Sequence, residues 1–221
     1  MDNLKVWITH YTKLNKRKTE VIKQLDDRSL KYEFIENYDR EVLTDEHFKL
    51  FNLKILGKAR ISLLFKHIEA WYKIVDSPFD YNLIFEDDVI LHKDFNNKLQ
   101  LAINELPENY DLVFIGDGCG YHIFPRSRIK PNKLIYEKAR TYQRGEGHGG
   151  TRCADSYLVS KKCAKIISDH ITNMKKNNKT NRVAVDFLLN ELIVQYKLNV
   201  FWMEPTIVTQ GSQNGKFVSS I

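Results

Sequence analysis

The amino-acid sequence predicts an α/β fold in which a mainly parallel central sheet is covered by helices on both faces. Short apolar runs typical of strands alternate along the chain with segments whose apolar residues recur every three or four positions. This alternation favours parallel strands joined by helices. The length of 221 residues, with 43% hydrophobic and 28% charged residues, is typical of one globular domain. We therefore expect residues 1–221 to form a single domain.

The expected strands and helices alternate in order along the chain. Apolar runs predict strands at residues 4–9, 31–35, 81–91, 111–115, 157–159 and 200–203. Helical periodicity predicts helices at residues 16–25, 60–75, 95–106, 161–171 and 183–194. Thr44 is expected to cap a further helix within residues 39–56, and the polar residues 175–182 are expected to form a surface loop. The helix at residues 60–75 is the clearest because its apolar side chains form one broad stripe.

A basic, glycine-flanked segment at about residues 117–150 is expected to be a long loop. The chain has a net charge of +6, and basic residues are concentrated between His122 and Arg144, where Glu137 is the one acid. The basic residues there are Arg126, Arg128, Lys130, Lys133, Lys138, Arg140 and Arg144. We predict a mobile segment that orders over an anionic donor or acceptor, and an ordinary solvated loop is the alternative. A nucleic-acid module would more often carry a basic stripe along a regular element, so nucleic acid is not expected as a partner.

The sequence also bears on the compartment. It shows neither a signal peptide nor an uninterrupted apolar stretch of about 18 residues, so a soluble, cytoplasmic protein is expected. Cys119, Cys153 and Cys163 are odd in number and lack CxxC spacing, so they are expected to be free thiols.

Three consecutive carboxylates, Glu86, Asp87 and Asp88, end the apolar run that begins at Tyr81, and a second apolar run follows them. Burying like charges side by side is costly unless a cation or strong donors compensate. Mg²⁺ and Mn²⁺ take carboxylate oxygens as ligands and are often completed by substrate phosphates. A divalent metal site at a strand end is therefore one interpretation, and a solvated turn between two strands is the other. In a parallel sheet, ligands bind beyond such strand ends.

Several of these segments together resemble glycosyltransferase family 25. The resemblance lies in residues 6–8, 61–75, 83–89 (Leu-Ile-Phe-Glu-Asp-Asp-Val), 94–95, 110–116, 156–164, 185–186 and 203–205. His67 occupies the place of the family's helix histidine. Where the family usually has Gly-Cys and then Ser-His, this chain has Ser62-Leu63 and then Lys66-His67. The resemblance implies a GT-A type nucleotide-sugar fold, a UDP-hexose donor carrying galactose or glucose, a divalent Mn²⁺ or Mg²⁺, and inversion at the anomeric carbon.

The resemblance and the chemistry of the acids together suggest roles for individual residues. Asp88 is expected to bind the metal, with Glu86 as its partner through the ribose or a metal-bound water, because alternating residues of a strand share a face. Asp87 then points elsewhere, still next to the bound donor. The residues expected to contact the nucleotide are Thr9 and His10 at the base and ribose, and Arg17 or Lys58 at phosphate.

An inverting transfer also needs a base that takes the proton from the acceptor hydroxyl. Asp186 is the candidate, because the resemblance places the family's helix-start aspartate there. Asp155 and Asp117 are rivals, and an ordinary first-turn acid favoured by the helix dipole is the alternative for Asp186.

The expected function is therefore metal-dependent transfer of a hexose from a UDP-sugar to a hydroxyl on a glycan or protein. One alternative is a catalytically inactive binding protein of the same fold that holds an anionic glycan or polymer. Metal-dependent nucleotidyl transfer ranks last, because no second acidic cluster accompanies the triplet.

Overall fold

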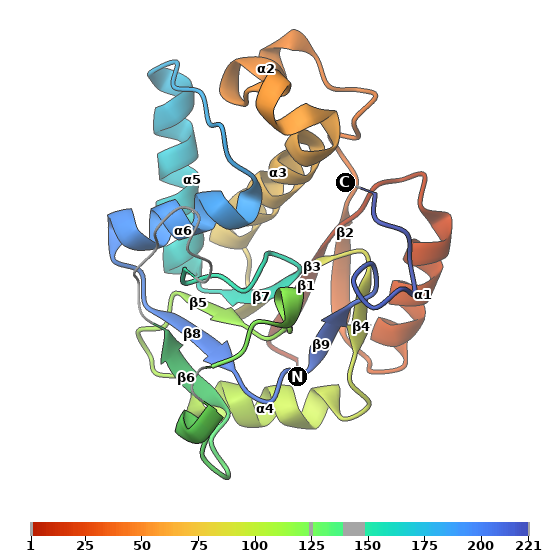
Figure 1. Cartoon of the computed structure of the whole chain (residues 1–221), viewed down its shortest axis with the longest axis vertical. Helices are drawn as coiled ribbons and strands as arrows, with labels where there is room; N and C mark the ends of the chain where they lie inside the picture. Colours follow the sequence, from red (N-terminus) through yellow and green to blue (C-terminus); the bar gives the residue numbers. More distant parts are fainter. Residues whose placement is uncertain (1, 124–125, 139–148, 221) are drawn as a thin grey trace.

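The computed structural model describes residues 2–123, 126–138 and 149–220 (Figure 1). Their central element is a seven-stranded sheet with the strand order β2-β1-β3-β7-β5-β8-β6. Its strands are β1 (Leu4–Thr9), β2 (Lys31–Ile35), β3 (Tyr81–Glu86), β5 (Leu112–Phe114), β6 (Ile135–Lys138), β7 (Ser156–Val159) and β8 (Val200–Met203). A small second sheet pairs β4 (Val89–Leu91) with β9 (Val208–Gln210).

The prediction of a mainly parallel sheet is confirmed, because most of the strands run in the same direction. β1 is parallel to both β2 and β3, and β5 is parallel to β8. β7 runs antiparallel between β3 and β5, and β6 is antiparallel to β8 at the edge. β2, β1, β3, β5 and β8 therefore point one way and present their carboxyl ends along one side of the sheet.

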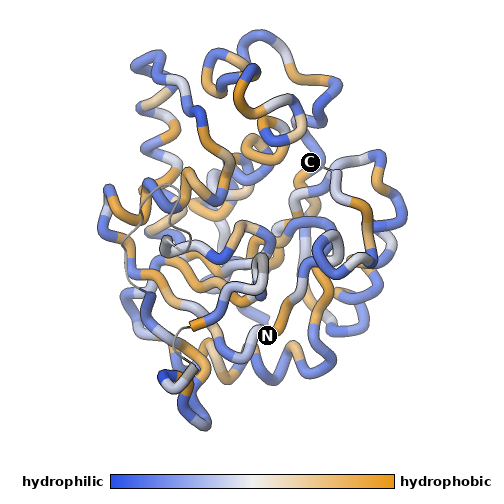
Figure 2. Tube along the Cα trace, in the orientation of Figure 1, coloured by the Kyte–Doolittle hydropathy of each residue, from blue (hydrophilic) through white to orange (hydrophobic). Residues whose placement is uncertain are grey.

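Helices cover both faces of this sheet, as predicted. They are α1 (Asn15–Asp26), α2 (Asp45–Leu50), α3 (Leu53–Val75), α4 (Phe95–Glu105), α5 (Lys161–Lys176) and α6 (Val185–Tyr196). One hydrophobic core joins α3, α5 and α6 to one face, and a second joins α1 and α4 to the other (Figure 1). Figure 2 shows hydrophobic residues along the central strands and hydrophilic ones in the outer loops.

Strand alternation explains how one short sequence serves both cores. In β1, Val6 and Ile8 pack against α1 and α4, whereas Trp7 packs into the core that contains α3. In β3, Phe85 and Ile84 divide in the same way, since successive side chains of a strand point to opposite faces. The strands before the acidic residues are thus held on both faces, which fixes where the acids emerge.

Of the two helices between β2 and β3, α2 begins as predicted and α3 does not. Thr44 caps α2 as expected, and His47 completes a reciprocal capping box. α3 begins at Leu53, seven residues before the predicted start at residue 60, and it is kinked at Gly57, where φ is +72°. Such a positive φ suits glycine, which has no Cβ. The kink separates a short, exposed first turn from the long buried stripe that was predicted.

The prediction of a structureless loop over residues 117–150 is wrong in part. Ile135 and Tyr136 are buried, and β6 pairs with β8 in register from Ile135 opposite Met203. The Glu105 carboxylate accepts hydrogen bonds from the backbone amides of Leu134 and Ile135, which anchors the start of β6. This edge strand is four residues long and surrounded by charge, so its apolar signal is weak. Residues 124–125 and 139–148, including Arg140 and Arg144, lie outside the described residues.

Two further expectations concern the membrane and the cysteines. Within the described ranges, no helix combines the length and apolar character needed to cross a bilayer. Cys153 and Cys163 are free thiols, as expected, and the side chain of Cys119 is outside the described part of the structure.

Candidate active site

The candidate site lies where β1 and β3 end side by side. Thr9, the last residue of β1, is in register with Glu86, the last residue of β3. Asp87 and Asp88 form the turn that leads from β3 into β4. Both carboxylates are buried. The turn between the two strands is therefore not solvated, in contrast to one of the two interpretations of the sequence. The chain places two acids in a buried turn, where their charge must be compensated.

The negative charge of Asp87 is balanced by side chains from two neighbouring elements, α1 and the end of β1. Its Oδ1 lies 2.8 Å from Nη1 of Arg17 on α1, and its Oδ2 lies 2.8 Å from Nδ1 of His10. The backbone amide of Tyr11 also donates to Oδ2, at 3.3 Å. Burial alone would raise the pKa of Asp87, but the hydrogen bonds from His10 and Arg17 outweigh it and lower the pKa. Asp87 therefore links the end of β3 to α1 and to the end of β1. Because its carboxylate already accepts three hydrogen bonds, it has few lone pairs left to bind a ligand.

Asp88 is compensated only in part. Its Oδ2 accepts a hydrogen bond from the backbone amide of Ser212 at 3.2 Å and lies 3.9 Å from Arg17 Nη1. Its Oδ1 is buried and has no hydrogen-bond partner among the described residues. A buried carboxylate oxygen without a partner is costly, and a bound cation or donor group would satisfy it. One oxygen of Asp88 is thus open to a ligand, and the metal role expected for this residue stays a prediction.

A second open carboxylate oxygen belongs to Asp155, which precedes β7. The Asp155 carbonyl accepts a hydrogen bond from the Glu86 amide at 2.8 Å, and its Oδ2 accepts one from Ser156 Oγ at 2.7 Å. Its Oδ1 is unpartnered within the described residues. Burial raises the pKa of Asp155 to about 7, with a further contribution from Asp88. Gly116 makes room for this carboxylate, since a Cβ there would lie 2.6 Å from Asp155 Oδ2.

Glu86, the last residue of β3, lies close to these acids. Burial raises its pKa well above the usual value, and the nearby charge of Asp88 adds to the effect. Its Oε1 lies 3.8 Å from Nε2 of His67 on α3. His67 is fully buried, and burial lowers its pKa to about 3, so the imidazole is neutral at physiological pH. Its Nδ1 lies 3.0 Å from the Tyr157 hydroxyl, which also accepts from Trp71 Nε1.

Two hollows meet at Glu86, which lines both. The smaller, of about 40 Å³, is lined by Thr9, His10, Tyr11, Arg17, Arg40, Ala59, Ser62, Leu63, Lys66, Glu86, Asp87 and Ser220. The larger, of about 500 Å³, is lined by parts of α3 and of α6, by Cys153 and Ala154, and by Gln210 and Gln213. The sequence prediction that Thr9, His10, Arg17, Glu86 and Asp87 gather at one place is consistent with the smaller hollow.

Asp186 lines the larger hollow together with Glu86. It lies in the first turn of α6, and burial raises its pKa, while hydrogen bonds from backbone amides of the helix start act in the opposite direction. A carboxylate with a raised pKa accepts a proton more readily near neutral pH. Asp186 and Glu86, at the end of β3, thus border one space.

Lys58, the other predicted phosphate contact, lies outside both sets of lining residues. Its Nζ is 6.0 Å from the centre of the Phe48 ring, and the side chain is exposed. Lys58 follows the kink of α3 at Gly57, and no signal in the sequence placed this kink.

Lys66, Ser62 and Arg40 are among the lining residues that were missed at the sequence level. Lys66 is buried and donates to the Asp39 carboxylate and to the Asn37 carbonyl, both at 2.7 Å. Ser62 lines the hollow one helical turn away from it, and Arg40 lies over the Tyr11 ring at 4.1 Å. The i, i+4 spacing of positions 62 and 66, on the helix that carries His67, was the available signal.

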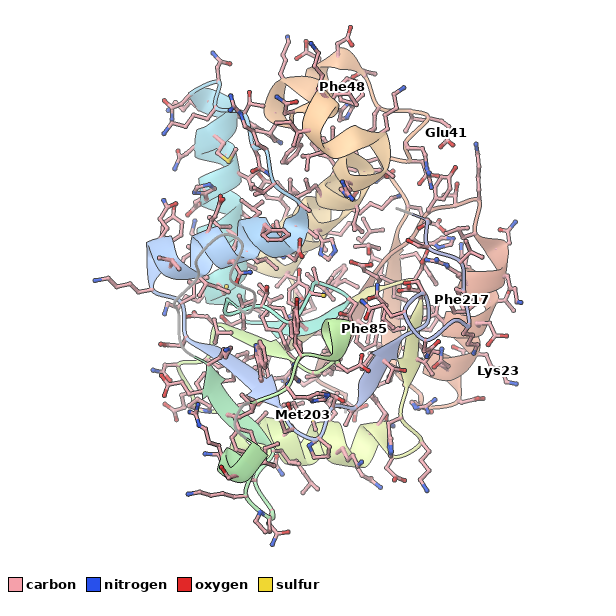
Figure 3. The ribbon with its side chains drawn as sticks, viewed as in Figure 1. Lys23, Glu41, Phe48, Phe85, Met203 and Phe217 are labelled. Atoms are coloured by element: carbon pink, nitrogen blue, oxygen red, sulfur yellow. The ribbon has the colours of Figure 1, made fainter. Side chains whose placement is uncertain are left out.

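Residues 211–220 pass over the acidic turn, which the sequence did not suggest. The Gly211 amide donates to the Asp88 carbonyl at 2.7 Å, and the Arg17 guanidinium lies 5.5 Å from the centre of the Phe217 ring. Arg17 Nη2 donates to the Val218 carbonyl, and Ser220 reaches the smaller hollow. Figure 3 shows Phe217 beside α1, on the same segment.

A divalent cation fits this donor set in a limited way. The described residues contain no group of three or more histidine, cysteine, aspartate or glutamate side chains arranged to hold a metal. The unpartnered oxygens of Asp88 and Asp155 are two hard ligands of the type that Mg²⁺ and Mn²⁺ accept. A site with two carboxylates is completed by water or by phosphate oxygens of a substrate.

The sequence is similar to proteins of known description. The family model "Glycosyltransferase family 25 (LPS biosynthesis protein)" matches residues 3–189. The lipooligosaccharide biosynthesis protein lex-1 of Haemophilus influenzae is 30% identical over 165 residues, which are 72% of this chain and 52% of that protein. A second protein of that organism, named "Putative glycosyltransferase", is 24% identical over 213 residues, covering 92% and 69% of the two chains. This chain thus spans about half the length of lex-1.

Among solved structures, a glycosyltransferase involved in the glycosylation of the major capsid of PBCV-1 is 12% identical, with a TM-score of 0.38. The match covers 77% of this chain and 66% of that one.

Proposed function

The chain belongs to glycosyltransferase family 25, and from that premise we propose that it transfers a hexose from a UDP-sugar to a hydroxyl group of a glycan acceptor, with inversion. The observation that carries the proposal is the position of Glu86, which lines two hollows at once. One hollow receives the nucleotide and the other receives the acceptor. The reacting carbon then lies between them, next to the acids at the end of β3.

The smaller hollow is proposed as the donor side. Thr9 and His10 line it from the end of β1, and Arg17 and Arg40 bring positive charge toward a diphosphate. Its volume of about 40 Å³ has room for only a few water molecules. Donor binding therefore requires the segment around Phe217 to move away from Arg17.

The open oxygens of Asp88 and Asp155 would hold a divalent cation, with Glu86 in reach of the same group. The cation would supply positive charge that stabilises the departing nucleoside diphosphate. Asp87 holds Arg17 and His10 in position and so keeps the donor side in shape. Negative charge without a partner at the end of β3 favours a bound cation, because the cation lowers the free energy of the ionised acids.

Asp186 is proposed as the base in the larger hollow. Its carboxylate lines the space that an acceptor hydroxyl would enter, and burial raises its pKa toward the range where a base works well. Attack from that side, opposite a leaving group held at the donor side, gives inversion. The neutral His67 ring lies 3.8 Å from Glu86 Oε1 and adds no charge there.

The experiment that tests this function is a screen of UDP-sugars by release of UDP. Purified protein is incubated with UDP-galactose, UDP-glucose and other UDP-sugars, each with lipooligosaccharide-type acceptors, with Mn²⁺ and with a chelator. We expect release above the background of the Asp88→Ala variant for a UDP-hexose, dependent on the divalent metal. A protein that only binds an anionic glycan would release no UDP with any donor or acceptor, and that result would overturn the proposal.

A further inference from the structure

Two segments of the chain carry seven basic residues and no acidic residue. The segments are residues 53–60 and 175–182. The basic residues are Lys54, Lys58, Arg60, Lys175, Lys176, Lys179 and Arg182. The whole chain has a net charge of +6, so these two short segments carry more positive charge than the rest of the molecule in sum. We call the surface that they form the basic face.

The fold brings the two segments together. The Asn52 amide donates to the Asn181 carbonyl at 3.0 Å, and the Asn181 amide donates to the Leu50 carbonyl at 2.8 Å. Thr180 Oγ1 also donates to the Lys49 carbonyl at 3.0 Å. The start of α3 and the connection from α5 to α6 are therefore joined by backbone pairing. Both lie on the side of the molecule that carries α2 and Phe48, away from α1 and Lys23 (Figure 3).

The basic face presents its cations to solvent. All seven side chains are exposed, and none has a carboxylate within 4.0 Å among the residues that the structure describes. Some lysines elsewhere do pair with an acid, for example Lys5, Lys18 and Lys165. Exposed cations gathered without an ion pair repel one another, which favours an anionic partner at this surface.

Large apolar side chains are exposed within the basic face and beside it, where Phe187 of α6 lines the larger hollow with Ile55. Leu53 is 36% exposed, Ile55 is 52% exposed and Phe187 is 41% exposed. Ile55 and Phe187 also line the larger hollow, together with Arg60 and Arg182. An exposed apolar group bordered by lysine and arginine is typical of surfaces that lie in the interface of a bilayer.

We propose that the basic face docks the protein on a bilayer surface that contains anionic lipids. Five of its seven cations are lysines, which act as flexible point charges and suit a diffuse charged surface more than the bidentate recognition of one phosphate. Leu53, Ile55 and Phe187 insert among the head groups, a contribution that a soluble polyanion would not use. The larger hollow then opens next to the bilayer. The binding does not depend on the transfer reaction, although it would bring a membrane-held acceptor to Asp186.

The test measures binding of the full chain to vesicles by co-sedimentation. Vesicles of phosphatidylcholine with phosphatidylglycerol are compared with vesicles of phosphatidylcholine alone. The test variant is Lys54→Glu/Lys176→Glu/Lys179→Glu, whose three positions lie outside the proposed donor and acceptor contacts. The control is Lys16→Glu/Lys23→Glu/Lys93→Glu, which makes the same change in net charge at exposed positions on the α1 and α4 side. Melting temperatures verify that both variants are folded.

We expect the wild-type chain and the control to bind anionic vesicles and to release them as salt rises. The test variant should bind roughly a hundredfold more weakly, since each basic residue near such a surface adds to the affinity. A Leu53→Ser variant should weaken the binding that remains at high salt. Equal binding by the test variant and the control would overturn the proposal. So would binding to heparin or duplex DNA without binding to vesicles, which would identify the partner as a soluble polyanion.

Discussion

Asp87 and Arg17 form a buried ion pair of 2.8 Å that ties the end of β3 to α1. The next residue along the chain, Asp88, leaves one buried oxygen without a partner among the described residues. Two neighbouring acids of similar burial thus have opposite relations to their surroundings. The first is satisfied by the protein, and the second is open to a ligand. Substitution of Asp87 is therefore expected to lower stability, whereas substitution of Asp88 is expected to lower activity.

Asp87→Asn is expected to destabilise the fold by about 3 kcal/mol, because it leaves the Arg17 guanidinium buried with a weaker partner. Chemical denaturation of the purified variant measures this loss. Asp88→Asn is the matched comparison, and its free energy of unfolding should stay within about 1 kcal/mol of the wild type. The Asp88→Asn substitution removes a negative charge that repels the carboxylates of Glu86 and Asp155. Equal losses of stability in the two variants would contradict the distinction.

The stability of the protein should fall as His67 is forced to ionise. Burial lowers the pKa of His67 to about 3, whereas an unfolded histidine titrates near 6.5. Below pH 6.5 the unfolded chain therefore binds a proton that the folded chain does not. The contribution of neutral His67 to the free energy of unfolding is thus complete above pH 6.5 and is lost as the pH falls toward 3. The slope approaches about 1.4 kcal/mol per pH unit.

Denaturation midpoints between pH 7 and pH 4 measure this slope in the wild type and in His67→Gln. The variant should be less stable at pH 7 but should lose less stability on acidification. His92→Gln, at a half-exposed position, serves as the control and should keep the wild-type slope. An unchanged slope in His67→Gln would show that the histidine does not stay neutral in the fold.

Much of the fold was predictable because long periodic segments determine it locally. β1 and β2 have the bounds that their apolar runs predicted, and residues 60–75 are helical. β6 and β9 were not predictable, since each is stable only through its partner strand, which lies far away in the sequence. The first turn of α3 was hidden by Gly57, where the helix is kinked.

The candidate site was predictable in its acids and less so in their individual roles. The run of three carboxylates after an apolar strand pointed to one place, but spacing alone does not tell which acid is neutralised. That depends on Arg17 and His10, which approach Asp87 from α1 and from the end of β1. Asp155 was expected only as a rival base, and its proximity to Glu86 comes from the antiparallel β7.

Asp186→Asn is expected to lower turnover at least a hundredfold while leaving UDP affinity unchanged, because an amide cannot accept the acceptor's proton. Glu191→Gln, at an exposed position of the same helix, is the matched control. Transfer rate, UDP binding and melting temperature are measured for both. If turnover of Asp186→Asn stays within a few-fold of the wild type, another group is the base. Burial raises the pKa of Asp186, so the acidic limb of the rate profile should lie above the ordinary aspartate value of about 3.9.

Phe217→Ala is expected to tighten donor binding by several-fold, since it removes the ring that lies against Arg17 and so favours opening of the smaller hollow. UDP affinity by calorimetry measures the change. Val218→Ala is the control, because its side chain is 89% exposed and only its backbone carbonyl contacts Arg17. Weaker UDP binding by Phe217→Ala would mean that the segment holds the donor rather than covering its site.

The end of β3 is proposed as the place where a divalent cation and the donor diphosphate meet, and Asp88 tests this claim. The transfer rate is measured against Mn²⁺ concentration for the wild type and for Asp88→Asn, with the same donor and acceptor. We expect a metal-dependent rate for the wild type and a loss of at least a hundredfold for the variant at an unchanged melting temperature. Near wild-type turnover of Asp88→Asn with the same dependence on Mn²⁺ would contradict it.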